Sequence, residues 1–219
     1  MMSFIIAGGG LSGLSCAHKL LENGKDVIIV ESRAEIGTPT RSPGYSSKKL
    51  EIIENIIDDI SGIEWRGGYS FRREWLEKRL AINLAKQGCE IITRTRIIEG
   101  NEDHIIFQGA GKLASGKLSG KVVDLLGVKS TAAGWFGNCS ALNEKPEVSK
   151  WNGGICIDEN ILDMDYSFKR ADGLIECWWQ GELDKQPPSW LEFMSGEHQG
   201  VPDAANSIER GLNLADQLL

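Results

Sequence analysis

The sequence is poor in the residues that metal sites and nucleic-acid surfaces need. Its 219 residues include only three histidines, far apart at positions 18, 104 and 198, so we predict no metal site. Acidic side chains outnumber basic ones by 31 to 24, and the net charge of −7 argues against a nucleic-acid partner. The five cysteines are odd in number and form no CxxC pair, which is typical of reduced thiols in a cytoplasmic protein.

Long apolar runs are also missing. No stretch is long and apolar enough to cross a bilayer, so we predict no membrane span. The N-terminal apolar run has no basic residues before it and is interrupted by three glycines, so we do not expect a signal peptide. What is present is an ordinary soluble composition, 41% hydrophobic and 25% charged, in a chain long enough for one large domain, or for one domain that carries a small subdomain.

The most informative feature is a glycine-rich turn between two apolar strands. Residues 3–7 have the pattern of a buried strand, and residues 8–13 read Gly-Gly-Gly-Leu-Ser-Gly. A helix is expected from 11 to 23, Gly24 ends it, and residues 27–30 form a second buried strand. This order of strand, turn, helix and strand predicts a dinucleotide-binding unit, with a glycine-rich turn of an unrelated fold as the alternative.

Each residue of the turn has a separate physical task in such a unit. Gly8 permits the tight turn, Gly10 lets the backbone approach a pyrophosphate, and Gly13 lets the helix pack against the strand. Leu11 and Ser12 begin the helix, whose N-terminal amides and dipole favour a phosphate group. We therefore expect these five residues to contact the cofactor.

The second strand ends at an acidic residue. Glu31 is placed to accept hydrogen bonds from the adenosine ribose hydroxyls, and we include the following Ser32 and Arg33 in the site. A carboxylate at this position repels a 2′-phosphate, which argues against NADP as the ligand of this motif. The motif alone does not distinguish FAD from NAD.

Beyond Glu31 the alternation of strand and helix stops early. Apolar spacing predicts helices over 48–60 and 72–87, strands over 89–98, 104–107 and 122–126, and a surface hairpin or loop over 108–120. From 132 to 195 glycine, asparagine and tryptophan increase, and short strands are expected at 153–157, 164–169 and 174–180. The sequence ends on a helix with apolar residues at 208, 212, 215 and 219.

Four segments resemble the FAD-dependent oxidoreductase superfamily that includes glutathione reductase and the aromatic-ring hydroxylases. The first is the motif from Gly8 to Glu31. Residues 35–44 are similar to the family's IGxPxRxxG loop, residues 73–88 to its R-x-x-[F/L]-[D/E] helix, and residues 200–205 to its late G-D-A-A segment. The best likeness is to the geranylgeranyl reductase and flavin monooxygenase branch.

The resemblance implies that the cofactor is FAD and adds four residues to its site. Arg41 would lie over the flavin or the pyrophosphate, and Arg73 would lie near the cofactor. Asp203 would meet the ribityl or phosphate region, and Ala204 begins a helix that would point at the flavin ring. The alternatives are a solvated Arg41 and a surface Arg73, whose role Arg72 could take. Asp203 or Asn206 could also cap the last helix without any ligand.

The sequence also departs from this family. The chain is short for it, and only 132–195 is available for a substrate domain. The family's middle A-D-G-x-x-S element is degraded to residues 125–130, with leucine in place of aspartate. Ser42 replaces a cysteine of some members, and two residues are inserted between the glycine and Asp203 of the late motif.

Four tryptophans could line a substrate site or form a core, namely Trp151, Trp178, Trp179 and Trp190. No catalytic residue is identified.

The predicted fold class is α/β, a Rossmann-like FAD/NAD(P)-binding domain with a reduced antiparallel β cap. We expect residues 1–131 to form its first part, 132–195 a strand-rich cap or substrate segment, and 196–219 a C-terminal helix that completes the FAD-binding domain.

The predicted function is hydride transfer between FAD and a hydrophobic or aromatic small molecule, with NADH or NADPH as a transient electron donor. The alternatives are a non-catalytic flavin-binding protein, such as a sensor, carrier or subunit, and an NAD-dependent enzyme. A homodimer could complete a pocket that a short cap leaves open.

Overall fold

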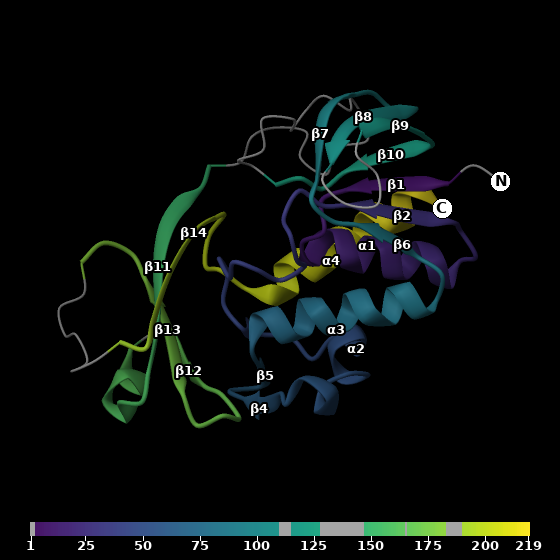
Figure 1. Ribbon diagram of the computed structural model, residues 1–219. Coiled ribbons are helices and arrows are strands. Elements are labelled where there is room, and N and C mark those ends of the chain that lie inside the picture. The colour runs from purple at the N-terminus through teal and green to yellow at the C-terminus, as the bar shows by residue number, and fades with distance from the viewer. Residues whose placement is uncertain (1–2, 110–114, 128–146, 165, 183–189) are drawn as a thin grey trace. The chain divides into compact units, whose positions relative to one another are not determined.

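The computed structural model describes residues 3–109, 115–127, 147–164, 166–182 and 190–219 (Figure 1). Contacts divide the chain into two compact units, each built from segments that are distant in sequence. The first unit comprises Met1–Thr38, Leu80–Pro146 and Ser207–Leu219, and the second comprises Pro39–Arg79 and Glu147–Asn206.

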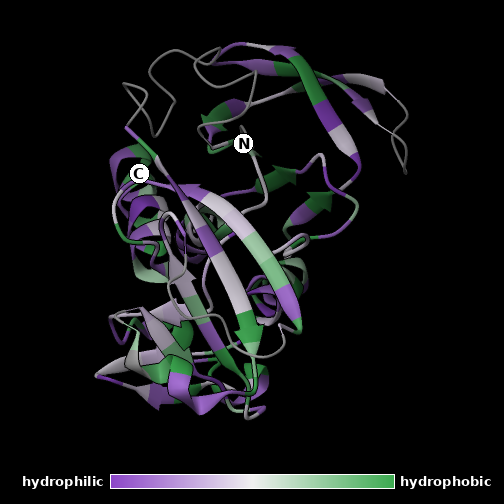
Figure 2. Cartoon of the chain, turned by 90° about the vertical axis from the view of Figure 1, so that its left-hand side faces the viewer, coloured by the Kyte–Doolittle hydropathy of each residue, from purple (hydrophilic) through white to green (hydrophobic). Residues whose placement is uncertain are grey.

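The first unit is built on a parallel sheet of four strands. In spatial order these are β10 (Lys121–Asp124), β1 (Phe4–Ala7), β2 (Val27–Val30) and β6 (Glu90–Ile92). Every pairing is parallel, and β1 lies in the interior between β10 and β2. Strands β1 and β2 are hydrophobic along their whole length, as expected for strands that are buried on both faces (Figure 2).

Helix α1 (Leu11–Glu22) packs on this sheet, and helix α4 (Ala204–Leu218) packs on α1. Helix α1 connects β1 to β2, and Gly24 takes a positive φ of 68° after its end. Helix α4 lies against α1, because a Cβ added to Gly211 would come within 2.1 Å of the Ser12 carbonyl oxygen. Helix α3 (Arg73–Lys86) confirms the predicted helix, and its leucine stripe at 76, 80 and 84 is buried.

A small antiparallel sheet completes the described part of the first unit. Its strands lie in the order β7 (Thr95–Gly100), β8 (His104–Gly109) and β9 (Ser115–Ser119). The prediction of one strand over 89–98 is wrong, because β6 and β7 are separate strands of different sheets. Arg94 breaks the strand with a φ of 54°, and its amide donates to the Arg33 carbonyl oxygen over 2.8 Å.

The second unit contains an antiparallel sheet of four strands, which we call the cap sheet. Its order is β12 (Ser167–Lys169), β13 (Ile175–Trp179), β11 (Ser149–Cys156) and β14 (Glu192–His198). The strands predicted at 153–157, 164–169 and 174–180 correspond to β11, β12 and β13, whereas β14 was not expected. A 3₁₀ turn, η3 (Glu159–Asp163), follows β11.

A second, smaller sheet belongs to the same unit. It has the order β3 (Tyr45–Ser46), β5 (Gly68–Ser70) and β4 (Ile63–Trp65). The Tyr45 ring stacks on Phe168 of the cap sheet at 5.4 Å, and Ser70 Oγ donates to the Lys169 carbonyl oxygen. Residues 39–79 therefore group with 147–206, whereas the sequence-based division placed them in the first part of the FAD-binding domain.

The helix predicted over 48–60 is wrong. This segment contains only one helical turn, α2 (Glu51–Glu54), and a 3₁₀ turn, η1 (Asp58–Ile60). Its apolar residues do face inward, since Ile52, Ile53, Ile56 and Ile60 are buried. Isoleucine, asparagine and aspartate are weak helix formers, and an apolar spacing of three and four residues fits consecutive turns as well as one helix.

Among the described residues, no helix has both the length and the apolar character needed to cross a membrane.

Candidate functional site

The glycine turn between β1 and α1 has the close packing that the sequence predicts. Gly8 has a φ of 110°, and a Cβ on it would lie 2.5 Å from the Leu125 carbonyl oxygen. A Cβ on Gly13 would lie 2.0 Å from the Gly8 carbonyl oxygen. Both positions are therefore restricted to glycine by neighbouring backbone atoms, which hold the start of α1 against the end of β1.

Gly10 differs from these two glycines. A Cβ on Gly10 would have no heavy atom within 4 Å, so no described protein atom fills the space beside it. Gly10 is also the N-cap of α1, where no side chain of the described residues caps the helix and the first turn holds no acidic residue. The amides of Leu11, Ser12 and Gly13 precede the first i to i−4 bond, which Leu14 makes to the Gly10 carbonyl oxygen over 2.9 Å.

These features together fit an anionic ligand. An uncapped helix N-terminus offers amide donors and a positive dipole end, and a phosphate group accepts hydrogen bonds from such donors. The open position beside Gly10 leaves room for that group to approach the backbone closely.

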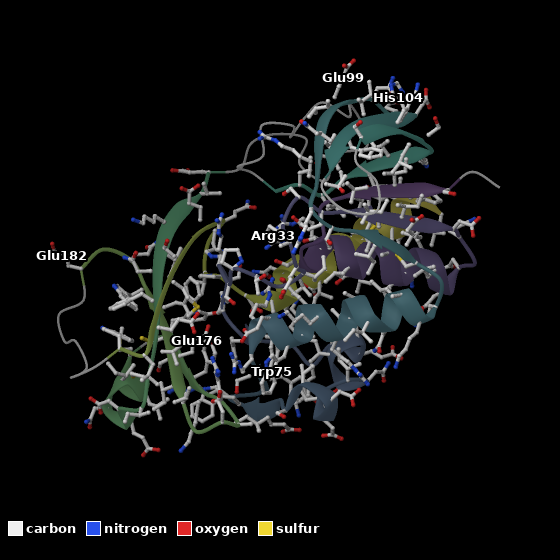
Figure 3. All side chains as sticks on the ribbon, in the orientation of Figure 1. Arg33, Trp75, Glu99, His104, Glu176 and Glu182 are labelled. Atoms are coloured by element: carbon white, nitrogen blue, oxygen red, sulfur yellow. The ribbon has the colours of Figure 1, made fainter. Side chains whose placement is uncertain are left out.

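Glu31 is buried at the carboxyl end of β2 and is held from several sides. Its Oε2 accepts from the Gly9 amide over 2.9 Å, and its Oε1 accepts from the Arg33 amide over 2.8 Å. The guanidinium of Arg33, which Figure 3 labels, reaches both oxygens. Ser32 Oγ donates to Oε1 over 3.2 Å. Burial alone raises the pKa of Glu31, but the hydrogen bonds and charge of Arg33 and the Gly9 bond bring it below its ordinary value.

The contacts of Glu31 determine how it could bind a ribose. A carboxylate offers about four lone-pair sites, and five donors already surround this one. Glu31 can therefore accept hydrogen bonds from ribose hydroxyls only if the side chain of Ser32 or Arg33 gives up its own hydrogen bond to the carboxylate. The two backbone donors would keep the carboxylate oriented during such an exchange.

The structure brings eight of the predicted site residues together in the first unit. They are Gly8, Gly10, Leu11, Ser12, Gly13, Glu31, Ser32 and Arg33, all within the strand–turn–helix–strand motif.

The other four predicted residues belong to the second unit and have structural contacts there. Arg41 is exposed, and its carbonyl oxygen accepts from His198 Nε2 over 3.0 Å. Arg73 is buried and donates to Glu77 over 2.9 Å and to the Pro43 carbonyl oxygen over 3.3 Å. Asp203 accepts from the Ala205 amide over 2.8 Å and so caps α4, whose first residue is the fully buried Ala204. Proximity of these four residues to a cofactor stays a prediction.

Three polar residues in structurally important places were missed by the sequence analysis. Asp124 is buried at the carboxyl end of β10, where its Oδ1 accepts from the Leu126 amide over 3.1 Å. Glu176 is buried in β13, and His198 ends β14. An acidic residue inside an apolar strand pattern was the available signal for Asp124 and Glu176, whereas nothing in the sequence marks His198.

Tryptophans and cysteines of the cap sheet are mostly packing residues. Trp178 is 1% exposed and packs with Ile155, Phe168 and Met194, so at this position the core alternative is confirmed. Trp179 and Trp190 stack on each other at 5.4 Å. Burial raises the pKa of Cys177 to about 12, which makes this thiol a poor nucleophile at neutral pH.

The degraded middle motif is only partly visible. The Leu125 amide extends the sheet by donating to the Ala7 carbonyl oxygen over 2.9 Å, and Gly127 has a φ of 81°. Residues 128–130 of the motif, and 132–146 of the expected cap segment, lie outside the described residues.

Comparisons with known proteins agree with this geometry. A family profile described as an NAD(P)-binding Rossmann-like domain matches residues 6–52, which contain the turn and Glu31. Digeranylgeranylglycerophospholipid reductase of Methanothrix thermoacetophila is 26% identical over 89% of this chain and 54% of its own length. The enzyme of the same name from Methanosarcina acetivorans is 28% identical over 61% of this chain and 39% of its own. The chain thus spans about half the length of these relatives or less.

Solved structures show a similar fold at low sequence identity. A geranylgeranyl bacteriochlorophyll reductase-like protein of Thermoplasma acidophilum has a TM-score of 0.73 at 16% identity, over 98% of this chain and 77% of its own. The p-nitrophenol 4-monooxygenase of Pseudomonas putida has a TM-score of 0.71 at 14% identity, over 100% and 79%. Aklavinone-11 hydroxylase, solved with FAD and aklavinone, has a TM-score of 0.66 at 15% identity, over 99% and 62%.

The turn geometry and the family profile show a Rossmann-like dinucleotide-binding fold, the chain is similar in sequence to the digeranylgeranylglycerophospholipid reductases, and its fold resembles those of geranylgeranyl reductase-like proteins and flavin monooxygenases.

Proposed function

We propose that this chain binds FAD and serves in an oxidoreductase that transfers a hydride between the flavin and a hydrophobic or aromatic small molecule. Two features support the proposal. The N-terminus of α1 beside Gly10 has no cap from a described side chain, and the buried Glu31 lies at the carboxyl end of β2. FAD, when bound, supplies the redox chemistry, and the protein supplies binding and orientation.

The residues of the first unit have separable tasks in this proposal. The amides of Leu11, Ser12 and Gly13 would bind the pyrophosphate, and the close packing at Gly8 and Gly13 fixes their direction. Glu31 would accept the ribose hydroxyls in exchange for a donor from Ser32 or Arg33. A carboxylate that is kept ionised by Arg33 disfavours a 2′-phosphate at the same place.

Arg41, Arg73, Asp203 and Ala204 enter the proposal through their match to family motifs. The exposed cation of Arg41 would suit a pyrophosphate or an anionic reduced flavin. The positive end of α4, at Asp203 and Ala204, would favour negative charge on the flavin ring. The contacts of Arg73 with Glu77 and Pro43 support an indirect role, in which it holds the backbone that carries Arg41.

The choice of a hydrophobic substrate rests on the relatives. The names of the related proteins denote reductases of a geranylgeranylated phospholipid, and the aklavinone-11 hydroxylase structure contains aklavinone. Geranylgeranyl chains are hydrocarbons, so we propose a hydrophobic or aromatic chemical class rather than one compound.

Anaerobic reduction of the flavin-loaded protein tests the oxidoreductase function. We expect NADH, NADPH or a chemical donor such as dithionite to bleach the flavin absorbance, and an added acceptor to restore it. Flavin that binds tightly but resists NADH and NADPH, and is not reoxidised by any quinone or oxygen after dithionite treatment, would favour a non-catalytic flavin-binding protein. A protein that binds NADH but no flavin would favour the NAD-dependent alternative.

A further inference from the structure

The backbone from Arg41 to Gly44, which we call loop 41–44, is fixed by hydrogen bonds inside the second unit, among them one of 2.8 Å from the Phe71 amide to the Gly44 carbonyl oxygen. The Arg41 carbonyl oxygen accepts from His198 Nε2 over 3.0 Å, and the Pro43 carbonyl oxygen accepts from the Arg73 guanidinium over 3.3 Å. At the other end, the Gly44 amide donates to Glu176 Oε1 over 3.1 Å. Pro43 adds a fixed φ and restricts Ser42 before it.

The two ends of loop 41–44 are held by the same face of the cap sheet. Glu176 Oε1 also accepts from the Trp178 indole over 2.8 Å, and the Trp178 ring meets the His198 ring edge-on at 5.8 Å. A row of three contacting side chains, on β13 and β14, thus runs from the amide of Gly44 to the carbonyl of Arg41. Figure 3 shows Glu176 among the side chains of the second unit.

The cap sheet is shaped for this contact. A Cβ on Gly196 of β14 would lie 2.1 Å from the Arg41 carbonyl oxygen and 2.5 Å from His198 Nε2. A glycine at position 196 therefore lets the loop and the histidine ring approach the strand. Because a carbonyl can only accept, His198 must carry its hydrogen on Nε2.

The row is anchored deeper in the unit by a buried cation. Arg170 is 4% exposed, and its Nη1 lies 3.5 Å from Glu176 Oε2. A second carboxylate, Asp172, pairs with Nη2 of the same guanidinium. Glu176 is therefore held on one oxygen by an ion pair and offers the other to the loop and to Trp178.

We propose that His198 and Glu176 are positioning residues for Arg41. By fixing the backbone of loop 41–44, they orient the Arg41 side chain toward the phosphate or flavin of the cofactor. The inference rests on the proposed FAD function, since it takes the exposed Arg41 cation as a cofactor ligand. All the fixed groups of the loop are backbone atoms, whereas the Arg41 side chain is exposed. A loop that is already ordered before binding loses less conformational entropy when the ligand binds, and this strengthens binding.

A double-mutant cycle tests this inference. His198→Phe keeps the aromatic ring beside Trp178 but removes the donor, His198→Gln restores an N–H donor, and Arg41→Met removes the cation. We expect FAD dissociation constants, measured by flavin fluorescence, to rise about three- to tenfold in H198F and to stay within about twofold of wild type in H198Q. In the R41M background, H198F should change the constant by less than about twofold, because the side chain that it positions is gone.

Hydrogen exchange gives a readout that does not depend on flavin. Amides of peptides covering 41–46 should exchange faster in H198F and in Glu176→Met, which removes the acceptor, than in wild type, while peptides covering β1 should not change. Wild-type affinity in H198F, or equal losses in both backgrounds, would overturn the inference. An R41M variant with wild-type affinity would also overturn it and leave FAD binding intact, whereas a wild-type protein that binds no FAD would remove the proposed function itself.

Discussion

At the scale of single residues, the three glycines of the turn separate packing from ligand binding. Gly8 and Gly13 face backbone oxygens at 2.5 and 2.0 Å, so their lack of a side chain is required by the protein itself. A Cβ on Gly10 would meet no atom of the described residues within 4 Å, so packing among these residues does not require glycine there. The three positions look equivalent in the sequence, and the structure distinguishes them.

Alanine should therefore affect protein stability at position 13 and FAD binding at position 10. We expect Gly13→Ala to lower the free energy of unfolding by about 1–3 kcal/mol, because its methyl group would overlap the Gly8 carbonyl. Gly10→Ala should unfold at the wild-type urea concentration but bind FAD at least about tenfold more weakly, since its methyl group would occupy the place that we propose for the phosphate. If G10A bound FAD as wild type does, the cofactor would not approach the turn in the proposed way.

Glu176 gives a prediction about pH. Burial, opposed by the Trp178 and Gly44 hydrogen bonds and by Arg170, raises its pKa from 4.5 to about 7. The folded protein then binds a proton that the unfolded chain releases, so this group's contribution to stability is full below pH 4.5 and is lost as pH rises through about 7. The total loss is about 3 kcal/mol by linkage.

Urea unfolding of wild type and Glu176→Gln between pH 4.5 and 8 measures this loss. Glutamine cannot ionise, so the stability of the wild type should fall relative to the variant as pH increases over this range. Parallel pH profiles of the two proteins would show that Glu176 titrates alike in the folded and unfolded states.

At the scale of elements, α4 shows how one residue can have a structural and a ligand-binding role. Asp203 caps α4 through the Ala205 amide and also accepts from the Ser47 amide over 3.3 Å. The family resemblance assigns the same carboxylate to the cofactor, and both roles use the N-terminus of the helix. Capping alone therefore does not exclude a contact with the flavin.

Two substitutions of Asp203 separate these roles. Asp203→Ala should lose about 1 kcal/mol of stability with the cap, while Asp203→Asn should keep it, because asparagine is an equally good N-cap. Both variants should bind FAD several-fold more weakly if the charge of the carboxylate matters to the cofactor. A D203N protein with unchanged FAD affinity would leave capping as the role of this residue.

Local patterns also explain which elements the sequence predicted correctly. The motif from β1 to β2 is defined by residues within one short window, and its boundaries agree with the structure to within one or two residues. The helix prediction over 48–60 was wrong because its isoleucines can be buried in several kinds of turn as well as in one helix. Strand β14 was missed because its exposed and buried residues, from Glu192 to His198, include few that favour strands.

At the scale of the whole molecule, long-range contacts limited what could be predicted. The Gly44–Glu176 bond joins residues 132 positions apart, and the Arg41–His198 bond joins residues 157 apart. No local pattern encodes such pairs, so the grouping of 39–79 with 147–206 and the fixation of loop 41–44 became visible only in the structure. The cofactor motif was predictable because its parts are neighbours in sequence.

Titration of the flavin-free protein with FAD, followed by its visible spectrum, shows whether this chain binds FAD. We expect one FAD bound per chain, with the shifted flavin absorbance bands of a protein-bound ring. We also expect a midpoint of thermal unfolding that rises with FAD concentration, because a ligand specific for the folded state stabilises it. A protein that stays colourless after incubation with excess FAD and dialysis, and whose midpoint of thermal unfolding is the same with and without FAD, would contradict FAD binding.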